Sequence, residues 1–183
     1  LELGSVTERS DRFEEACEIL TMLFSQDRTT FRGEYYVLDE APMEPKPLQS
    51  PLPLLIGGGG EKRTLRTVAR FATEWNSWGR PEELRHKISV LERHCEEVGR
   101  DPAEIQKSAV GVLMFTETEE KAAELQENLG YRSGLVGTPV QLRQVVAEYA
   151  AVGVDELLVP DFAFSAGKRN DNLDRFRAEV VDY

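Results

Sequence analysis

Apolar residues recur along the chain with two alternating periods, one typical of helices and the other typical of short buried strands. The first helical period runs from Thr7 to Gln26. Residues 30–38 then combine aromatic and β-branched side chains, which predicts a small hairpin or extended arm. Five prolines between residues 42 and 53 exclude a regular helix and predict an extended connection. Residues 1–50 are therefore expected to form a lead-in of helix, hairpin and proline-rich connection.

Beyond residue 50, short apolar runs alternate with helical periods. Strands are predicted at residues 52–56, 74–78, 106–116 and 154–159, and helices at residues 61–72, 81–98, 118–129, 139–152 and 170–181. Such alternation is typical of α/β proteins, in which helices cover parallel strands. The pattern leaves two architectures open, a doubly wound open sheet and a segment of a (β/α)8 barrel. A full barrel usually needs about 250 residues, so the four βα units of residues 51–183 would be half of one.

Several residues at the predicted helix ends support these boundaries. Pro81 suits the first position of its helix, and Gly99 suits the position after its end. Thr138, Pro139 and Gln141 have the spacing of a capping box. We expect residues 1–183 to form a single domain.

Composition and charge narrow the function classes. Of the 183 residues, 40% are hydrophobic and 30% charged, as is ordinary for a globular protein. The net charge of -11 disfavours nucleic-acid binding, and the absence of an 18-residue apolar run excludes a membrane-spanning helix. Cys17 and Cys95 fall on apolar helix faces, which favours a reducing, cytoplasmic location. Because the sequence begins at Leu1 rather than Met, we expect a processed, truncated or partial gene product.

The most informative stretch is the run Gly57–Gly60, which lies between a predicted strand and a predicted helix. Glycines at a strand end let the backbone turn tightly, and the following helix start offers further N–H donors that suit a phosphate. Lys62 and Arg63 are expected in the first helical turn, where an anion would offset their conflict with the helix dipole. The run matches neither the Walker loop nor G-x-G-x-x-G. The alternative is a flexible turn with both cations solvated.

The sequence also resembles a known family in several stretches that arrive in the family's order. They are residues 12–15, 30–36, 45–47, 51–60, 70–76, 98–102 and 153–157. Together they resemble the luciferase-like oxidoreductases, relatives of bacterial luciferase that use FMN or a deazaflavin coenzyme. The chain departs from the family at Thr73-Glu74, where Asp-Gly is usual.

The resemblance implies a (β/α)8 TIM-barrel fold of which this chain is the C-terminal half. It implies that the cofactor lies at the barrel mouth, near the glycine run. The cofactor-binding residues carried over are Gly57, Gly58, Gly59, Gly60, Arg63, Thr64, Trp75 and Asn76. The first half of the family barrel supplies most acid and base groups, so no catalytic residue can be carried over.

The expected function is an oxidoreductase that transfers a hydride or an oxygen atom to a small organic substrate. The cofactor is either deazaflavin coenzyme F-420 or FMN, and the four-glycine form of the loop slightly favours the deazaflavin. The alternative is a non-catalytic half barrel that acts as an assembly or binding partner. Under either hypothesis we expect a homo-oligomer or a complementary N-terminal half.

Other candidate residues have simpler explanations. His86 and His94 lack the spacing of a metal site, so we expect no metal and place both at a surface or core edge. Trp75 and Trp78 are expected to pack in the core first, with a role in a cofactor wall second. Residues 162–169 combine a glycine with two cations and form either an ordinary basic loop or a second phosphate site.

Overall fold

The computed structural model describes residues 4–132, 134–160 and 167–183, and these group into two compact units. The first unit contains the residues up to Ile56, Gly60–Glu74 and Leu91–Ile105. The second contains Gly57–Gly59, Trp75–Val90 and the residues from Gln106 onward. Most of the predicted loop at residues 162–169 lies outside the described residues. The single domain expected from the sequence stays a prediction.

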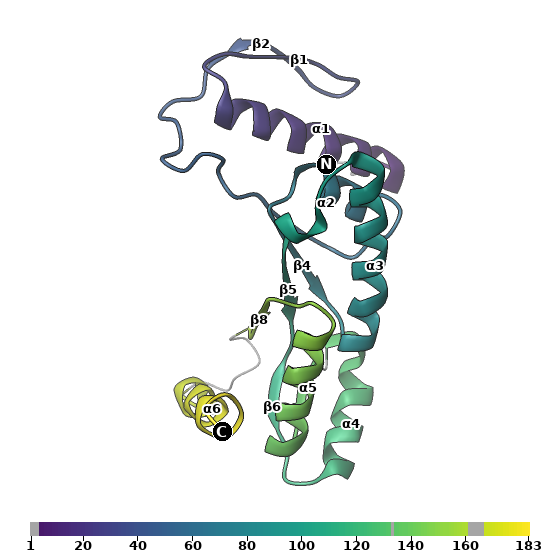
Figure 1. Ribbon diagram of the computed structural model, residues 1–183, viewed down its shortest axis with the longest axis vertical. Helices are drawn as coiled ribbons and strands as arrows, with labels where there is room; N and C mark the ends of the chain where they lie inside the picture. The colour runs from purple at the N-terminus through teal and green to yellow at the C-terminus, as the bar shows by residue number, and fades with distance from the viewer. Residues whose placement is uncertain (1–3, 133, 161–166) are drawn as a thin grey trace. The chain divides into compact units, whose positions relative to one another are not determined.

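The lead-in predicted for the N-terminal part is confirmed. Helix α1 (Val6–Ser25) begins after Ser5, whose side chain accepts a hydrogen bond from Glu8 N–H. Strands β1 (Thr29–Arg32) and β2 (Val37–Ala41) form an antiparallel hairpin, shown with α1 in Figure 1. The proline-rich residues 42–53 contain no helix or strand.

A carboxylate of α1 fixes the turn of this hairpin. Glu15 accepts hydrogen bonds from the backbone N–H groups of Glu34, Tyr35 and Tyr36, at 2.7, 3.0 and 3.1 Å. Charge-assisted hydrogen bonds are stronger than neutral ones, so one side chain holds three consecutive amides. The hairpin turn is thereby tied to α1.

Helix α2 (Thr64–Phe71) packs on α1 and is shorter than predicted. The sequence predicted a start at Glu61, but residues 61–63 form a turn, and Leu65 N–H donates to Gly60 O across it. Lys62 and Arg63 are therefore not in the first helical turn, which corrects that expectation. Arg70 of α2 pairs with Glu14 and Glu18 of α1.

The main sheet has the strand order β3-β4-β5-β8. Its strands are β3 (Leu55–Gly57), β4 (Glu74–Trp78), β5 (Gln106–Val110) and β8 (Glu156–Leu158). β5 and β8 are parallel, with Ser108 opposite Glu156 and Val110 opposite Leu158. The chain thus has an α/β fold with parallel strands, as predicted.

The prediction of one strand over residues 106–116 was wrong, because the structure has two strands there. The segment divides at Gly111 into β5 and β6 (Leu113–Phe115), and β6 pairs in parallel with β7 (Leu135–Gly137), a strand that the sequence did not predict. The division follows a change of hydrogen-bond partner. Gly111 N–H donates to Leu158 O of β8, whereas the next amide, of Val112, donates to Arg132 O.

The remaining helices begin where their capping residues predict. Helix α3 (Pro81–Val98) ends before Gly99, whose φ of 71° lies in the left-handed region. Helix α4 (Glu119–Leu129) begins after Thr118, and α5 (Pro139–Ala151) begins after Thr138 with the predicted capping box present. Figure 1 shows α4 and α5 in the second unit, where both contact β7. Short 3-10 helices span Pro102–Glu104 and Gly130–Arg132.

The last predicted helix, at residues 170–181, is two elements rather than one. Helix α6 (Arg169–Phe176) continues into a π-helical segment (Arg177–Val181). Arg143 of α5 donates a hydrogen bond to Glu179 O at 2.7 Å. That contact takes up a carbonyl where the helical ladder changes register.

Both cysteines are buried in the first unit and form no disulfide, as their helix-face positions predict. Cys17 is 3% exposed, and burial raises the pKa of its thiol to about 11. Such a thiol stays protonated near neutral pH and is a poor nucleophile.

Tyr149 of α5 has a large side chain in the core of the second unit and is 1% exposed. Its hydroxyl donates to Gly79 O at 2.8 Å. Burial, with a smaller effect of the Glu82 and Glu83 carboxylates, raises the pKa of the Tyr149 phenol. The phenol therefore remains a donor at neutral pH.

Tyr149→Phe is predicted to lower the free energy of unfolding by about 1–3 kcal/mol, because the Gly79 carbonyl loses its buried donor. The matched control is Tyr131→Phe, whose side chain is half exposed and should change stability by less than about 0.5 kcal/mol. Urea unfolding of both variants measures the difference. Equal losses would contradict the role assigned to Tyr149.

Candidate functional site

The glycine run forms a turn at the end of β3 that is fixed to the neighbouring strand β4. Gly58 has a φ of 126°, a conformation that side-chain-bearing residues rarely adopt. Its N–H donates to Asn76 O at 2.9 Å, and its carbonyl accepts the Trp75 indole N–H at 2.7 Å. The amide of Gly58 is therefore not available to a ligand, although the resemblance named Gly58 among the cofactor-binding residues.

Trp75 and Asn76 of β4 form the two hydrogen bonds that hold this turn. Trp75 is 1% exposed, so most of its ring packs in the core, which supports the first of its two expected roles. The Asn76 side chain donates to Ser108 Oγ of β5 at 2.8 Å, and Ser108 Oγ contacts Trp75 O at 3.3 Å. These bonds link the glycine turn to two successive strands of the second unit. A direct contact of Trp75 or Asn76 with a cofactor stays a prediction.

Gly59 is the residue of the turn that contacts a lysine side chain. Lys87 of α3 donates from its ammonium to Gly59 O at 3.0 Å. A Cβ built on Gly59 would lie 2.3 Å from Lys87 Nζ and 3.2 Å from Ser77 Oγ. By contrast, a Cβ built on Gly57 meets nothing within 4 Å in the described part of the chain. A side chain at residue 59 would therefore displace the flexible Lys87 ammonium from the turn, whereas Gly57 borders open space.

The N–H groups of Gly59 and Gly60 have no hydrogen-bond acceptor among the described residues. Consecutive backbone amides of this kind, in a turn, are a recurrent way to bind anions. Lys87 Nζ adds a positive charge beside the first of them. The arrangement can therefore bind an anionic group such as a phosphate.

The first unit holds the other predicted site residues. A Cβ built on Gly60 would lie 2.8 Å from Thr64 Oγ1, at the start of α2. Arg63 forms an ion pair with Asp11 and donates to Thr7 O, both on α1. Its guanidinium is thus committed to α1, and its predicted role at a phosphate has no support from these contacts.

Thr73, the departure from the family pattern, has a structural role of its own. Its hydroxyl accepts a hydrogen bond from Leu54 N–H at 2.8 Å, and its N–H donates to Leu54 O at 3.0 Å. These bonds fix the chain just before β3 and β4 begin. Replacing Asp-Gly by Thr-Glu therefore still allows a defined turn here.

Sequence reasoning missed Lys87, although its position carries a signal. Leu84, Ile88 and Leu91 form the buried stripe of α3, and Lys87 lies three residues after the first of them. Residues three and four apart share a helix face, so this lysine borders the apolar stripe rather than the solvent face. A lysine at such a position extends its charge toward whatever the helix packs against.

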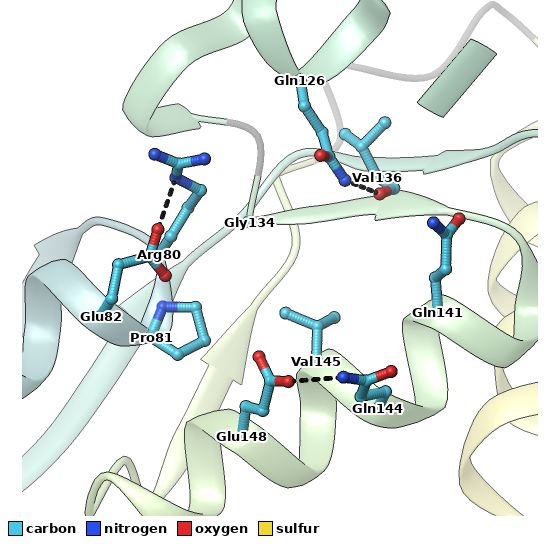
Figure 2. A pocket seen from close by; sticks show the side chains of 10 residues that line it. All are labelled: Arg80, Pro81, Glu82, Gln126, Gly134, Val136, Gln141, Gln144, Val145 and Glu148. Carbon is cyan, nitrogen blue, oxygen red and sulfur yellow. Dashed lines mark hydrogen bonds and ion pairs between the residues drawn. The ribbon is translucent and has the colours of Figure 1, made fainter. Parts of the chain in front are cut away.

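A separate polar pocket of about 260 Å³ lies in the second unit (Figure 2). Its lining residues are Arg80, Pro81, Glu82, Gln126, Gly134, Val136, Gln141, Gln144, Val145 and Glu148. The polar side chains pair with one another or with backbone. Arg80 contacts Glu82, Gln126 donates to Val136 O, and Gln144 donates to Glu148 (Figure 2). With two carboxylates against one guanidinium, this pocket does not favour an anion.

The histidines take the positions expected of them. His86 is exposed, and His94 contacts Glu61 O and Glu97 at the surface of the first unit.

Among the residues that the structure describes, no group of three or more His, Cys, Asp and Glu side chains could hold a metal ion. Within the same residues, no helix is long and apolar enough to cross a membrane.

Comparisons with known proteins agree with this fold. The structure of an F420-dependent secondary alcohol dehydrogenase superposes with a TM-score of 0.78 at 21% identity, covering 98% of this chain and 63% of that one. A long-chain alkane monooxygenase superposes with a TM-score of 0.76 at 15% identity, covering 100% of this chain and 58% of that one.

Two curated relatives are similar in sequence. The FMNH(2)-dependent dimethylsulfone monooxygenase of Pseudomonas fluorescens is 27% identical over 82% of this chain and 52% of its own length. The F420-dependent hydroxymycolic acid dehydrogenase of Mycobacterium tuberculosis is 27% identical over 74% of this chain and 37% of its own length. The chain thus spans about half the length, or less, of these relatives.

A family model described as luciferase-like monooxygenase matches residues 4–129, which include the hairpin, the glycine turn and Lys87. The match covers more than half of the chain and agrees with the relatives and the fold. The chain belongs to the luciferase-like monooxygenase family.

Proposed function

We propose that the glycine turn binds the phosphate-bearing tail of a flavin-type cofactor, FMN or deazaflavin coenzyme F-420. The chain would then form the C-terminal half of a (β/α)8 barrel in an oxidoreductase that acts on a small organic substrate. The observation that carries the proposal is the unpartnered amide of Gly59, whose own carbonyl accepts a hydrogen bond from the Lys87 ammonium.

The residues present fit a phosphate. Gly57 leaves open space on the turn, and Gly59 and Gly60 supply N–H donors. Gly58 cannot donate, but its two bonds to β4 keep the turn rigid. A preorganised turn binds an anion with little ordering cost. The phosphate is therefore the part of the cofactor that this chain is best suited to hold.

When bound, such a cofactor would supply the hydride-transfer or oxygen-transfer chemistry. The role of this chain would be to position it. Trp75 and Asn76 would orient the turn, and Lys87 would balance charge. Relatives dependent on FMNH(2) and on F420 both support the proposal, so it names both cofactors.

A second candidate function is that of a non-catalytic half barrel that acts through assembly. The strand order places β3 and β8 at the two edges of the main sheet, where Leu55 is 49% and Leu158 is 38% exposed. Exposed apolar edge strands favour pairing with another chain. A second copy of this chain or a complementary N-terminal half could cover them.

The proposed function predicts that the full chain binds FMN or F-420 with a dissociation constant in the micromolar range or below. It also predicts weaker binding of riboflavin, which has the ring of FMN but not its phosphate. Fluorescence titration or calorimetry measures these constants. If neither cofactor binds at high micromolar concentration, the enzyme hypothesis is wrong for this chain.

Gly59→Ala is predicted to weaken binding of the phosphorylated cofactor by about tenfold or more, because the new Cβ would meet Lys87 Nζ at 2.3 Å. The control is Ser89→Ala, which should bind normally, because Ser89 is an exposed residue of α3 whose hydroxyl donates to His86 O rather than to the turn. Thermal unfolding shows whether each variant is folded before binding is compared. Equal binding by the two folded variants would argue against a role for the turn.

The assembly hypothesis predicts that the chain in solution has twice its mass of 20.7 kDa, or more. Leu158→Glu should shift the chain toward the monomer, because it places a charge on the exposed edge of β8. Val140→Glu should not, because Val140 is an exposed residue of α5, away from the sheet edge. Light scattering after gel filtration measures the mass. A stable, folded wild-type monomer would contradict self-assembly.

A further inference from the structure

Lys87 is a half-buried cation without a carboxylate partner among the described residues. Glu83, one helical turn earlier on α3, is the side chain best placed for an ion pair with it. Its carboxylate instead accepts the Arg80 N–H at 2.8 Å and caps the start of the helix. The Lys87 ammonium turns to the carbonyl of Gly59.

This arrangement leaves positive charge and donor capacity unused. An ammonium has three N–H donors, and the described contacts use one of them, toward Gly59 O. A neutral carbonyl compensates the partial loss of water around an ammonium less well than an anion does. An anion seated on the neighbouring Gly59 amide would accept from Lys87 as well.

Three cationic or titratable residues of the first unit, which the sequence places near the glycine run or on α3, have other contacts. Arg63 is paired with Asp11, and His94 contacts Glu61 O and Glu97. Lys62 is exposed and forms no described ion pair. Among the described residues, Lys87 is thus the cation whose contact lies on the glycine turn itself.

We propose that Lys87 is the charge-bearing residue of the phosphate site and that it selects a phosphorylated cofactor over an unphosphorylated one. This inference rests on the proposed function and assigns one residue within it. Amide donors alone bind anions weakly in a chain of net charge -11, because the surrounding acidic groups repel them. A cation beside the turn supplies the local positive potential that the rest of the chain opposes.

The Lys87 ammonium also lies close to the backbone of the turn. It occupies the space that a Cβ at residue 59 would fill, so a side chain there would move the ammonium away from Gly59 O. Phosphate would be held by a backbone amide on one side and a flexible ammonium on the other. Arginine, with a longer planar head, could restore the charge but not the same fit.

The test compares FMN with riboflavin in the full chain and in three lysine variants, two of which remove one positive charge each. Lys87→Met should weaken FMN binding by roughly ten- to a hundredfold, the worth of a hydrogen bond to a charged group. Riboflavin binding should be unchanged, so the preference for the phosphate is lost. Lys62→Met removes the same charge from an exposed position and should retain the preference. Lys87→Arg should restore part of it.

A second measurement keeps this inference separable from the proposed function. In a ¹H–¹⁵N NMR titration with inorganic pyrophosphate, the amide signals of Gly59 and Gly60 should shift in the wild type and not in Lys87→Met. If pyrophosphate gives this result but no flavin binds, the role of Lys87 stands and the proposed cofactor is wrong. If FMN binds and Lys87→Met keeps the full preference over riboflavin, the proposed function stands and Lys87 is not the phosphate residue. Loss of both effects in the wild type overturns both.

Discussion

The two hydrogen bonds that Gly58 forms with β4 determine how the candidate site is built. One joins its N–H to Asn76 O, and the other joins its carbonyl to the buried indole of Trp75. Together they hold a left-handed turn that only glycine adopts readily. Gly58 is committed to β4, whereas the N–H groups of Gly59 and Gly60 have no acceptor among the described residues. The site therefore depends on a glycine that itself binds nothing.

Charge is the second constraint. The chain carries -11 charges, so a site for an anion needs both preorganised donors and a local cation. Lys87 meets that need because Glu83 is used at the helix start, and Arg63 does not because Asp11 binds it. The pocket in Figure 2 is lined by several polar side chains, but two of them are carboxylates. That lining suits an uncharged or cationic ligand better than an anion. Electrostatics thus separates two polar sites in the same unit.

Much of the fold was accessible from the sequence because local signals agreed with it. Pro81 and the capping box at Thr138 set helix boundaries within one or two residues. The failures came from long-range partners. Gly111 and Val112 are adjacent and apolar, yet their amides bond to different segments, which splits a continuous-looking strand. The three-residue β7 was missed because its length carries no periodicity.

The candidate site was predictable only in part, because local sequence signals identify the turn but not its long-range contacts. The glycine run identified the turn, but hydrogen bonds formed on folding decide which amides stay open and which cations face them. Arg63 is near in sequence yet bound to α1, whereas Lys87 is 28 residues from Gly59 and contacts it. The central claim, that this turn holds a phosphate, is tested most directly by a crystal structure of the chain with FMN or F-420 bound. The account predicts a phosphate oxygen within hydrogen-bond distance of both the Gly59 amide and Lys87 Nζ, and a phosphate seated elsewhere, such as in the polar pocket of Figure 2, would contradict it.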